Sequence, residues 1–343
     1  MEAENISNID LNAPLKVGLV GTGFAAKKRA EALVADERSQ LVFVVGHTQD
    51  KAQTFCETYG ATLLDSWQNL VKKPDLDLIF IASTNRDRAT IARGALEAGK
   101  HVVAEYPPAL KPSDAASLIN LAKTQSLLFH VEHIELLGGL HQAIRQNLAK
   151  IGTVFYARYI TISPKRPAPR RWNYHHQLYG FPLSAALSRI HRFTDLFGSV
   201  NQVSCQSKFW DIPEANFYYS ACLCAAQLRF DCGLIADITY GKGEHFWQAQ
   251  RTFELHGEQG SLIFIGEKGT LVQGETLIPI EVGSRRGLFA HDTTLVLDHL
   301  LTGKALYVEP QASYYALKVA DGARHSAEIG RTVVINGEDK NLL

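Results

Sequence analysis

Val17-Gly18-Leu19-Val20-Gly21-Thr22-Gly23-Phe24-Ala25-Ala26 is the stretch that decides the fold of the N-terminal half of this chain. An apolar run leads into a Gly-x-Gly-x-x-Ala pattern, and helical spacing follows. In such a turn Gly21 permits a tight bend, Gly23 lets the backbone approach a pyrophosphate, and Ala26 keeps the helix close to the sheet. The first N–H groups of the helix, which starts near Phe24, then face the phosphates. The stretch predicts a dinucleotide-binding unit; an ordinary tight turn between a strand and a helix is the alternative.

Outward from this unit, short apolar runs alternate with helical patterns as far as about Leu128. The runs are Lys16–Val20, Leu41–Val45, Asp77–Ala82 and His101–Ala104, and the helical patterns are Ala25–Ala35, Ala52–Tyr59, Asp87–Ala98 and Ser113–Gln125. This alternation implies a parallel sheet covered by helices on both faces. We predict a Rossmann NADP-binding domain over residues 15–130, preceded by a disordered leader at residues 1–14.

The end of the second predicted strand indicates which cofactor is used. It reads Gly46-His47-Thr48-Gln49, and no carboxylate occurs before Asp50. An acid here would hold the ribose 2′-hydroxyl of NAD, whereas polar and cationic side chains suit a 2′-phosphate, so NADPH is favoured over NADH. Four residues at the ends of the second and third predicted strands are assigned to the cofactor: His47, Thr48, Ser83 and Thr84. Three cations on the first helix either add positive field or form a solvated face: Lys27, Lys28 and Arg29.

After about Gly152 the pattern changes to runs rich in β-branched and aromatic residues. These runs are Val154–Ile162, Tyr218–Phe230, Leu234–Tyr240, Arg251–His256 and Leu262–Ile265, with late helices near Thr293–Leu301 and Ala312–Ala327. Prolines make the stretch Ser163–Arg171 a loop. We predict an α/β plus α+β chain: the Rossmann parallel sheet, then a substrate domain over residues 131–330 with a large, open, mostly antiparallel sheet and helices, and a tail over residues 331–343.

Composition excludes some classes of function. Lysine and arginine total 35, as do aspartate and glutamate, so the formal net charge is zero and nucleic acid is not an expected partner. No apolar run reaches the roughly 18 residues of a membrane span. Five widely spaced cysteines form no disulfide framework and fit a reducing cytoplasm. The open sheet could face solvent, cover a substrate or form an oligomer.

Three sequence blocks carry a resemblance to a known family. Ala98–Pro107 reads Ala-Gly-Lys-His-Val-Val-Ala-Glu-Tyr-Pro and resembles the glucose–fructose oxidoreductase/inositol dehydrogenase family, in which Glu-Lys-Pro is usual and Tyr106 here replaces the lysine. With the blocks His130–Leu137 and Gly180–Gly198, the chain is similar to the biliverdin reductases of the cyanobacterial type within that family. The resemblance extends from about Leu15 to about Ala320.

This resemblance implies NADPH-dependent reduction of biliverdin IXα at the C10 methine bridge, giving bilirubin IXα. In sugar-oxidising relatives the Glu-Lys-Pro lysine and a downstream histidine handle the hydroxyl proton. Here the corresponding Asp and His positions fall near Ser184 and Ser188, so the proton-handling pair is absent. Arg189 matches the Ser-Arg motif and is assigned to stabilise charge near the bilin nitrogens or to orient a water, unless it only pairs with Asp195. Tyr106 is the second catalytic candidate, as a ring that stacks on the bilin or positions the cofactor.

The remaining candidates concern substrate and cofactor contacts. Glu105 is assigned to a cofactor-ribose contact or to the domain seam. Biliverdin carries two propionates, so cations are expected around it, and its flat tetrapyrrole suits an aromatic ring. The residues assigned to the substrate are Arg170, Arg171, Trp172, Ser188, Arg192, Lys242 and His245. The cluster His130–Glu135 lacks the i, i+4 spacing of helical zinc sites, so no metal is expected and a hydrogen-bonded seam is favoured. Two rival functions remain: a sugar or inositol dehydrogenase, and a non-catalytic NADP-binding regulator.

Overall fold

The computed structural model describes residues 14–335, which divide into two compact units. The described residues up to Ile134 and the segment Arg286–Tyr314 form the first unit; Glu135–Arg285 and the described residues from Tyr315 on form the second. The expected disordered leader, apart from Pro14, and the tail beyond Ile335 lie outside the described residues. Among residues 14–335, no helix combines the length and the apolar character needed to span a bilayer.

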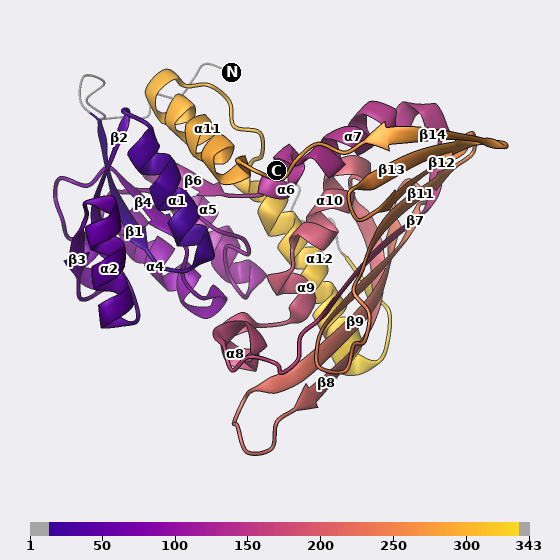
Figure 1. Cartoon of the computed structure of the whole chain (residues 1–343), viewed down its shortest axis with the longest axis horizontal. Helices are drawn as coiled ribbons and strands as arrows, with labels where there is room; N and C mark the ends of the chain where they lie inside the picture. The colour runs from indigo at the N-terminus through magenta and orange to yellow at the C-terminus, as the bar shows by residue number, and fades with distance from the viewer. Residues whose placement is uncertain (1–13, 336–343) are drawn as a thin grey trace. The chain divides into compact units, whose positions relative to one another are not determined.

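The first unit contains a six-stranded parallel sheet. Its strands are β1 (Leu15–Val20), β2 (Ser39–Val45), β3 (Thr62–Leu64), β4 (Leu78–Ile81), β5 (His101–Ala104) and β6 (Phe129–Val131). They are arranged in the order β3-β2-β1-β4-β5-β6 (Figure 1). All residues of β4 and β5 are buried, as expected for strands covered on both faces. Because strand order reverses between β1 and β4, the loops after these two strands are where a doubly wound sheet binds its ligand.

Five helices among the described residues of the first unit connect these strands, and a sixth, α11, comes from late in the chain. They are α1 (Phe24–Ala35), α2 (Gln49–Tyr59), α3 (Trp67–Val71), α4 (Asn85–Glu97), α5 (Pro112–Thr124) and α11 (Leu288–Thr302). In α1 the small residues Ala26 and Ala30 and the apolar Leu33 are completely buried, so one face of the helix lies against the sheet. The strands and helices predicted in this half of the chain agree with these bounds to within a few residues.

Helix α11 comes from late in the chain, yet it belongs to the first unit. Its Val296, Leu297 and Leu300 share a buried core with residues of β1 and α1 such as Leu19 and Leu33. This differs from the sequence-based boundary, which placed all of residues 131–330 in one substrate domain. Apolar spacing identifies a face to be buried but not the partner that buries it, so the boundary was not visible in the sequence.

The second unit is built on a nine-stranded sheet. Its strands are β7 (Val154–Pro164), β8 (Val200–Asp211), β9 (Tyr219–Phe230), β10 (Ile235–Gly243), β11 (Gln250–Gly257), β12 (Gly260–Ile265), β13 (Lys268–Gln273), β14 (Thr276–Glu281) and β15 (Val333–Val334). The order is β14-β13-β12-β11-β7-β10-β9-β8-β15, and only the β7–β10 pair is parallel. Strand β15 places part of the predicted tail in the sheet, and β7 includes Ser163 and Pro164, which were predicted as loop.

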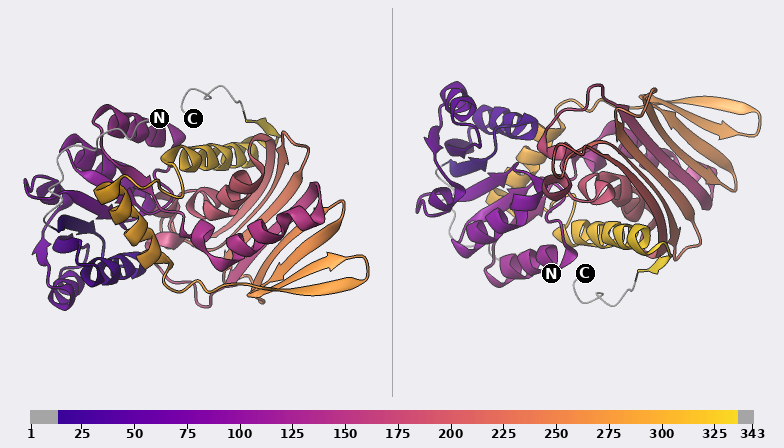
Figure 2. Two further views of the ribbon diagram at one scale, coloured as in Figure 1. Left: turned by 90° about the horizontal axis from the view of Figure 1, so that it is seen from above. Right: turned by 90° about the horizontal axis from the view of Figure 1, so that it is seen from below.

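The helices of the second unit lie on one face of this sheet (Figure 2). They are α7 (Gly139–Asn147), α8 (His176–Tyr179), α9 (Pro182–Ala185), α10 (Ser188–Phe197) and the long α12 (Pro310–Ile329); the short α6 (Ile134–Leu137) lies where the chain passes from one unit to the other. In β10 the side chains of Ala236, Ile238 and Tyr240 alternate with more exposed neighbours, as in a sheet with one covered face. The predicted fold class, a Rossmann sheet followed by a large mostly antiparallel sheet with helices, is confirmed.

Two ion pairs connect α11 to earlier parts of the first unit. Arg29 of α1 donates from Nη1 to Asp292 Oδ2 at 2.5 Å, and both side chains are completely buried. Arg38 donates to Asp298 Oδ1 at 2.7 Å, and these side chains are 36% and 22% exposed. Burial alone would raise the pKa of Asp292, but the charge of Arg29 and hydrogen bonds hold it well below its usual range. The buried pair is therefore ionised.

These pairs give a matched test of what holds α11 in place. Asp292→Ala leaves the Arg29 cation without its nearest carboxylate in a dry interior, which should lower the free energy of unfolding by about 3–5 kcal/mol. Asp298→Ala, on the same helix, should cost less than about 1 kcal/mol because its pair is solvated. Denaturant titration followed by circular dichroism measures both. Equal losses from the two variants would contradict the account.

Candidate active site

The glycine-rich turn after β1 has an open, uncapped helix end. Gly21 has φ +121°, and a Cβ there would lie 2.5 Å from the carbonyl oxygen of Ala82, so only glycine fits. Gly23 is the N-cap of α1 and has no side-chain cap; a Cβ on it would meet no other group within 4 Å. No side chain caps the first N–H groups of α1, and no acid lies in the first turn. This arrangement fits a pyrophosphate.

The neighbouring residues of this turn also have the predicted positions. Ala26 is completely buried against the sheet, as the close approach of helix and strand requires. Phe24 is 73% exposed and its ring lies edge-on to Phe289, at a centroid distance of 6.1 Å. Phe24 thus has a free face beside the phosphate-binding turn.

The ends of β2 and β4 bring together three of the predicted cofactor residues. Thr48 is the uncapped N-cap of α2, and His47 before it is exposed. Thr84 donates its hydroxyl to Asp87 at 2.7 Å. Burial raises the pKa of Asp87, but hydrogen bonds from Arg86 and Thr84 and the charges of Arg86 and His47 lower it below its usual value. His47 therefore lies close enough to the Thr84–Asp87 pair to influence it.

A buried arginine that the sequence analysis missed holds the turns after β4 and β5. Arg88 is 3% exposed and donates to the carbonyl oxygens of Ser83, at 2.8 Å, and of Pro107, at 2.7 Å. Burial lowers its pKa to about 10 against the opposing effect of Glu105, Glu132 and Tyr106, so the side chain stays charged at neutral pH. The carbonyl group of Ser83 is thus held by Arg88. The second hydrogen bond of Arg88, to Pro107, fixes the turn that carries Tyr106.

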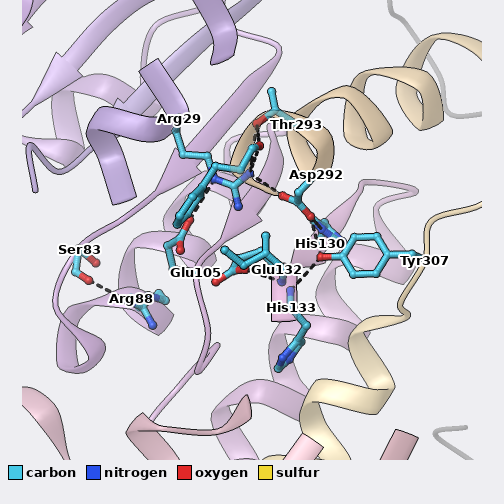
Figure 3. A network of polar contacts seen from close by, with 12 residues as sticks. Arg29, Ser83, Arg88, Glu105, His130, Glu132, His133, Asp292, Thr293 and Tyr307 are labelled. Atoms are coloured by element: carbon cyan, nitrogen blue, oxygen red, sulfur yellow. Dashed lines mark hydrogen bonds and ion pairs between the residues drawn. The ribbon is translucent and has the colours of Figure 1, made fainter. Parts of the chain in front are cut away.

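Glu105 is a partner of Arg29. Its Oε1 accepts from Arg29 Nε at 3.0 Å, in the same network in which Arg29 reaches Asp292 and Thr293 (Figure 3). Arg29 was predicted on a solvated or field-generating face of α1, and this expectation is wrong because its side chain is fully buried. The sequence did carry a signal, since Arg29 falls at helical spacing with Ala26, Ala30 and Leu33 on the apolar face.

Within the cluster His130–Glu135, His130 and Glu132 belong to this network, whereas Glu135 pairs with Arg192 and Arg285 of the second unit. His130 Nε2 lies 2.9 Å from Asp292 Oδ1, which also accepts from the Tyr307 hydroxyl at 2.7 Å. Burial and the nearby Glu105 raise the pKa of Glu132 well above its usual value, although Arg29 opposes this. Residues 14–335 contain no cluster of three or more His, Cys, Asp or Glu side chains arranged to hold a metal ion.

Tyr106 is held in a defined plane. Its ring stacks on His133, with centroids 5.2 Å apart and planes 4° from parallel. His133 is completely buried, and its Nε2 lies 2.6 Å from Ser313 Oγ. Tyr106 itself is half-buried.

In the second unit, Arg189 lies over two tyrosine rings at the start of α10. Its guanidinium carbon is 5.6 Å from the ring centroid of Tyr240 and 6.0 Å from that of Tyr159, and Nη1 donates to Ser188 Oγ at 2.9 Å. The alternative partner Asp195 is instead held by His141 and Arg145, each at 2.8 Å. Aromatic rings stabilise a cation without cancelling its charge.

The other predicted substrate residues divide into exposed and buried ones. Arg170, Arg171, Trp172 and His245 are exposed. Arg192 is 1% exposed and contacts Glu135 at 3.4 Å, and Lys242 is 5% exposed. Burial lowers the pKa of Lys242 to about 8, although Cys222 and Cys224 raise it. Arg192 and Lys242 were expected as cations at a pocket mouth, and the structure instead places both inside the second unit.

Comparison with known proteins covers both units. A model of the "Oxidoreductase family, NAD-binding Rossmann fold" matches residues 15–133, and one of the "Oxidoreductase family, C-terminal alpha/beta domain" matches residues 142–335. A crystal structure of biliverdin reductase from Synechocystis sp. PCC 6803, in complex with biliverdin and NADP+, is 56% identical to this chain with a TM-score of 0.90. That similarity covers 92% of this chain and 99% of the other.

Two more distant relatives differ from each other in the substrate that their names give. Mouse biliverdin reductase A is 26% identical over 188 residues, which are 55% of this chain and 60% of the mouse protein. A dTDP-3,4-didehydro-2,6-dideoxy-alpha-D-glucose 3-reductase from Saccharopolyspora spinosa is also 26% identical, over 261 residues that cover 74% of this chain and 75% of that enzyme. Similarity at this level is thus shared by bilin and sugar reductases.

The open space at Gly23 gives a test that separates folding from cofactor binding. Gly23→Ala places a methyl group where no protein atom lies and at an ordinary negative φ, so the thermal midpoint should not change. The same methyl should keep a pyrophosphate from the α1 N–H groups, and losing one or two such charged hydrogen bonds raises the Kd for NADPH about 10- to 100-fold. NADPH fluorescence titration measures this change. Wild-type affinity in the variant would show that the phosphates bind elsewhere.

Proposed function

Because the chain belongs to the oxidoreductase family that joins an NAD-binding Rossmann fold to a C-terminal alpha/beta domain, we propose that it is an NADPH-dependent biliverdin reductase. The reaction adds a hydride to the C10 methine bridge of biliverdin IXα and a proton to a pyrrolic nitrogen, giving bilirubin IXα. The observation that carries the proposal is the 56% identity, over 92% of this chain, to a biliverdin reductase solved with biliverdin and NADP+.

The residues at the proton-handling positions favour a bilin over a sugar. Alcohol oxidation or ketone reduction needs a group that exchanges the hydroxyl proton. In this chain those positions hold Tyr106, whose ring is stacked on His133, and the buried Ser184 and Ser188. None of the three is the lysine or histidine that handles the hydroxyl proton in the sugar-oxidising relatives, and reduction of a conjugated methine bridge requires no hydroxyl proton to be removed.

The first unit holds the cofactor in this proposal. NADPH, when bound, supplies the hydride. Gly21 and Gly23 leave room for the pyrophosphate at the N-terminus of α1, and Ala26 and the exposed Phe24 flank it. His47 and Thr48 contact the 2′-phosphate, with Ser83 and Thr84 completing the site at the end of β4. Glu105 acts through Arg29, because its carboxylate is already bound there, and so orients the turn that carries Tyr106.

Arg189 is the proposed catalytic cation. A positive charge near the central nitrogens of the bilin withdraws electrons from C10 and makes it a better hydride acceptor. An arginine is effectively always protonated, so it stabilises charge or orients a water and does not donate its own proton. The rings of Tyr159 and Tyr240 and the Ser188 hydroxyl fix its guanidinium in advance of the reaction.

The propionates of the substrate are assigned to exposed cations. Arg170, Arg171 and His245 are accessible, and Trp172 beside them is 39% exposed with one side packed against Tyr179. Arg192 is buried and paired with Glu135, so it is not assigned to a direct contact with a propionate. Tyr106 positions the cofactor or stacks on the bilin.

We also propose a cytoplasmic location and a place in heme degradation, where biliverdin is produced. The five cysteines are all free, and four of them are buried, which suits a reducing compartment. The zero net charge supports the absence of a nucleic-acid partner. One face of the nine-stranded sheet carries no helix among the described residues, so this face is the proposed site of any oligomer contact.

The visible spectrum of biliverdin IXα mixed with protein and NADPH tests the proposal. The long-wavelength biliverdin band should disappear while a yellow bilirubin band grows. Arg189→Ala should lower kcat about 10²- to 10³-fold, because it removes one preorganised charge from the transition state. Arg229→Ala serves as the control, since Arg229 is exposed on β9 and has no assigned role.

Two outcomes would contradict the proposal, and a third would change only the role of Arg189. Tight NADPH binding without a spectral change would indicate the non-catalytic regulator. Reduction of NADP+ that depends on a polyol would indicate the sugar dehydrogenase. Full activity of Arg189→Ala would leave the reductase in place but remove the assigned role of Arg189.

A further inference from the structure

Lys242 occupies an aromatic cage on the helix-covered face of the second sheet. Its Nζ lies 3.6 Å from the ring centroid of Tyr179, 4.7 Å from that of Tyr174 and 5.5 Å from that of Tyr219. Nζ also donates to the carbonyl oxygen of Asn173. These partners come from the 3₁₀ turn Trp172–Tyr174 with Asn173 in it, from α8 and from β9, so one ammonium group holds three segments together.

The cage is connected to Arg189 through a pair of tyrosines. The hydroxyl groups of Tyr179 and Tyr240 are 3.0 Å apart and hydrogen-bonded. The ring of Tyr240, two residues before Lys242 on β10, lies under the Arg189 guanidinium at 5.6 Å. A cation, two hydrogen-bonded tyrosines and a second cation thus follow one another along the covered face.

We propose that Lys242 is a positioning residue for bilin reduction: its ammonium group fixes Tyr179, Tyr179 fixes Tyr240, and Tyr240 supports the guanidinium of Arg189. This inference rests on the proposed function and adds to it a residue that acts through others without touching the substrate. A desolvated cation over an aromatic ring is one of the stronger non-covalent contacts that a lysine can make. Neutralising the ammonium removes that contact and loosens the ring pair beneath Arg189.

Titration of Lys242 makes the role observable. Burial lowers its pKa from 10.5 to about 8. The titratable groups facing it are Cys222 and Cys224 of β9 and the three cage tyrosines. Burial raises the pKa of each of these groups, to about 11 for Cys222, so they keep their protons while Lys242 loses its own. The kcat for biliverdin should therefore fall as the pH rises through about 8.

Protein stability should change in the opposite direction. Below pH 8 the buried charge costs stability, because the unfolded chain keeps lysine charged in water at no such cost. Between about pH 8 and 10.5 the folded chain has released this proton and the unfolded chain has not, so stability rises with pH. Relative to Lys242→Met, the wild type should become more stable while its kcat falls, which a purely structural role would not produce.

The test compares pH profiles of kcat and KM for biliverdin in four proteins. Lys242→Met keeps the length of the side chain and removes its charge; kcat should fall about tenfold with KM unchanged, and the decline near pH 8 should disappear. Tyr179→Phe keeps the ring but breaks the hydroxyl pair that joins Lys242 to Tyr240, so kcat should fall and the decline near pH 8 should flatten. Lys208→Met is the matched control, because Lys208 is exposed and its Nζ, 4.9 Å from the Trp210 ring, lies outside the cage.

The outcomes separate this inference from the proposed function. If the wild type turns over biliverdin and Lys242→Met has the same kcat and pH profile, only the positioning role of Lys242 is overturned. A raised KM at constant kcat also overturns it, because that result indicates direct contact with a propionate. No turnover by the wild type overturns the proposed function, and this inference with it. If Lys242→Met does not fold, Tyr179→Phe and the pH profile of the wild type decide. The inference then fails if Tyr179→Phe keeps the full kcat, or if the kcat of the wild type does not decline near pH 8.

Discussion

The first unit depends on one buried cation, Arg29. Its guanidinium contacts Glu105 after β5 and Asp292 on α11, which are 76 and 263 positions away in the sequence. A charge in a dry interior is tolerated only when carboxylates and hydrogen bonds compensate it, so α11 must pack on α1 for this network to be complete. Because the Glu105 carboxylate is paired with Arg29, it has no catalytic role in this account. The same pair fixes the turn that carries Tyr106. The position of a candidate catalytic ring thus follows from a structural ion pair.

The two units stabilise their cations in different ways, and the difference suits their proposed tasks. In the first unit carboxylates neutralise Arg29, while the proposed phosphate site is the N-terminal end of α1, which no side chain caps. In the second unit Arg189 and Lys242 lie on tyrosine rings, which stabilise a cation but leave its charge in place. A positive charge held by rings at Arg189 suits a reaction that draws electrons away from C10.

How far the sequence could predict these features depends on how local their causes are. Gly21 and Gly23 were predicted because a tight turn and an uncapped helix end are properties of a few consecutive residues. The role of Arg29 depends on a carboxylate late in the chain, which no local pattern reveals, although its place among Ala26, Ala30 and Leu33 marked it as buried. Lys242 was predicted near the bilin but as a surface cation. The alternation along β10 put it on the covered face with Tyr240, and only the structure shows the tyrosines that enclose it.

The central claim is that hydride passes from NADPH to C10 of biliverdin on this protein. The most direct measurement uses NADPH deuterated at C4 of the nicotinamide, prepared separately with the label on each face, and locates deuterium in the bilin product by NMR. We expect one of the two labelled cofactors to place a single deuterium at C10 of bilirubin IXα. Product without deuterium at C10 from either cofactor, or deuterium at another carbon, would contradict the account.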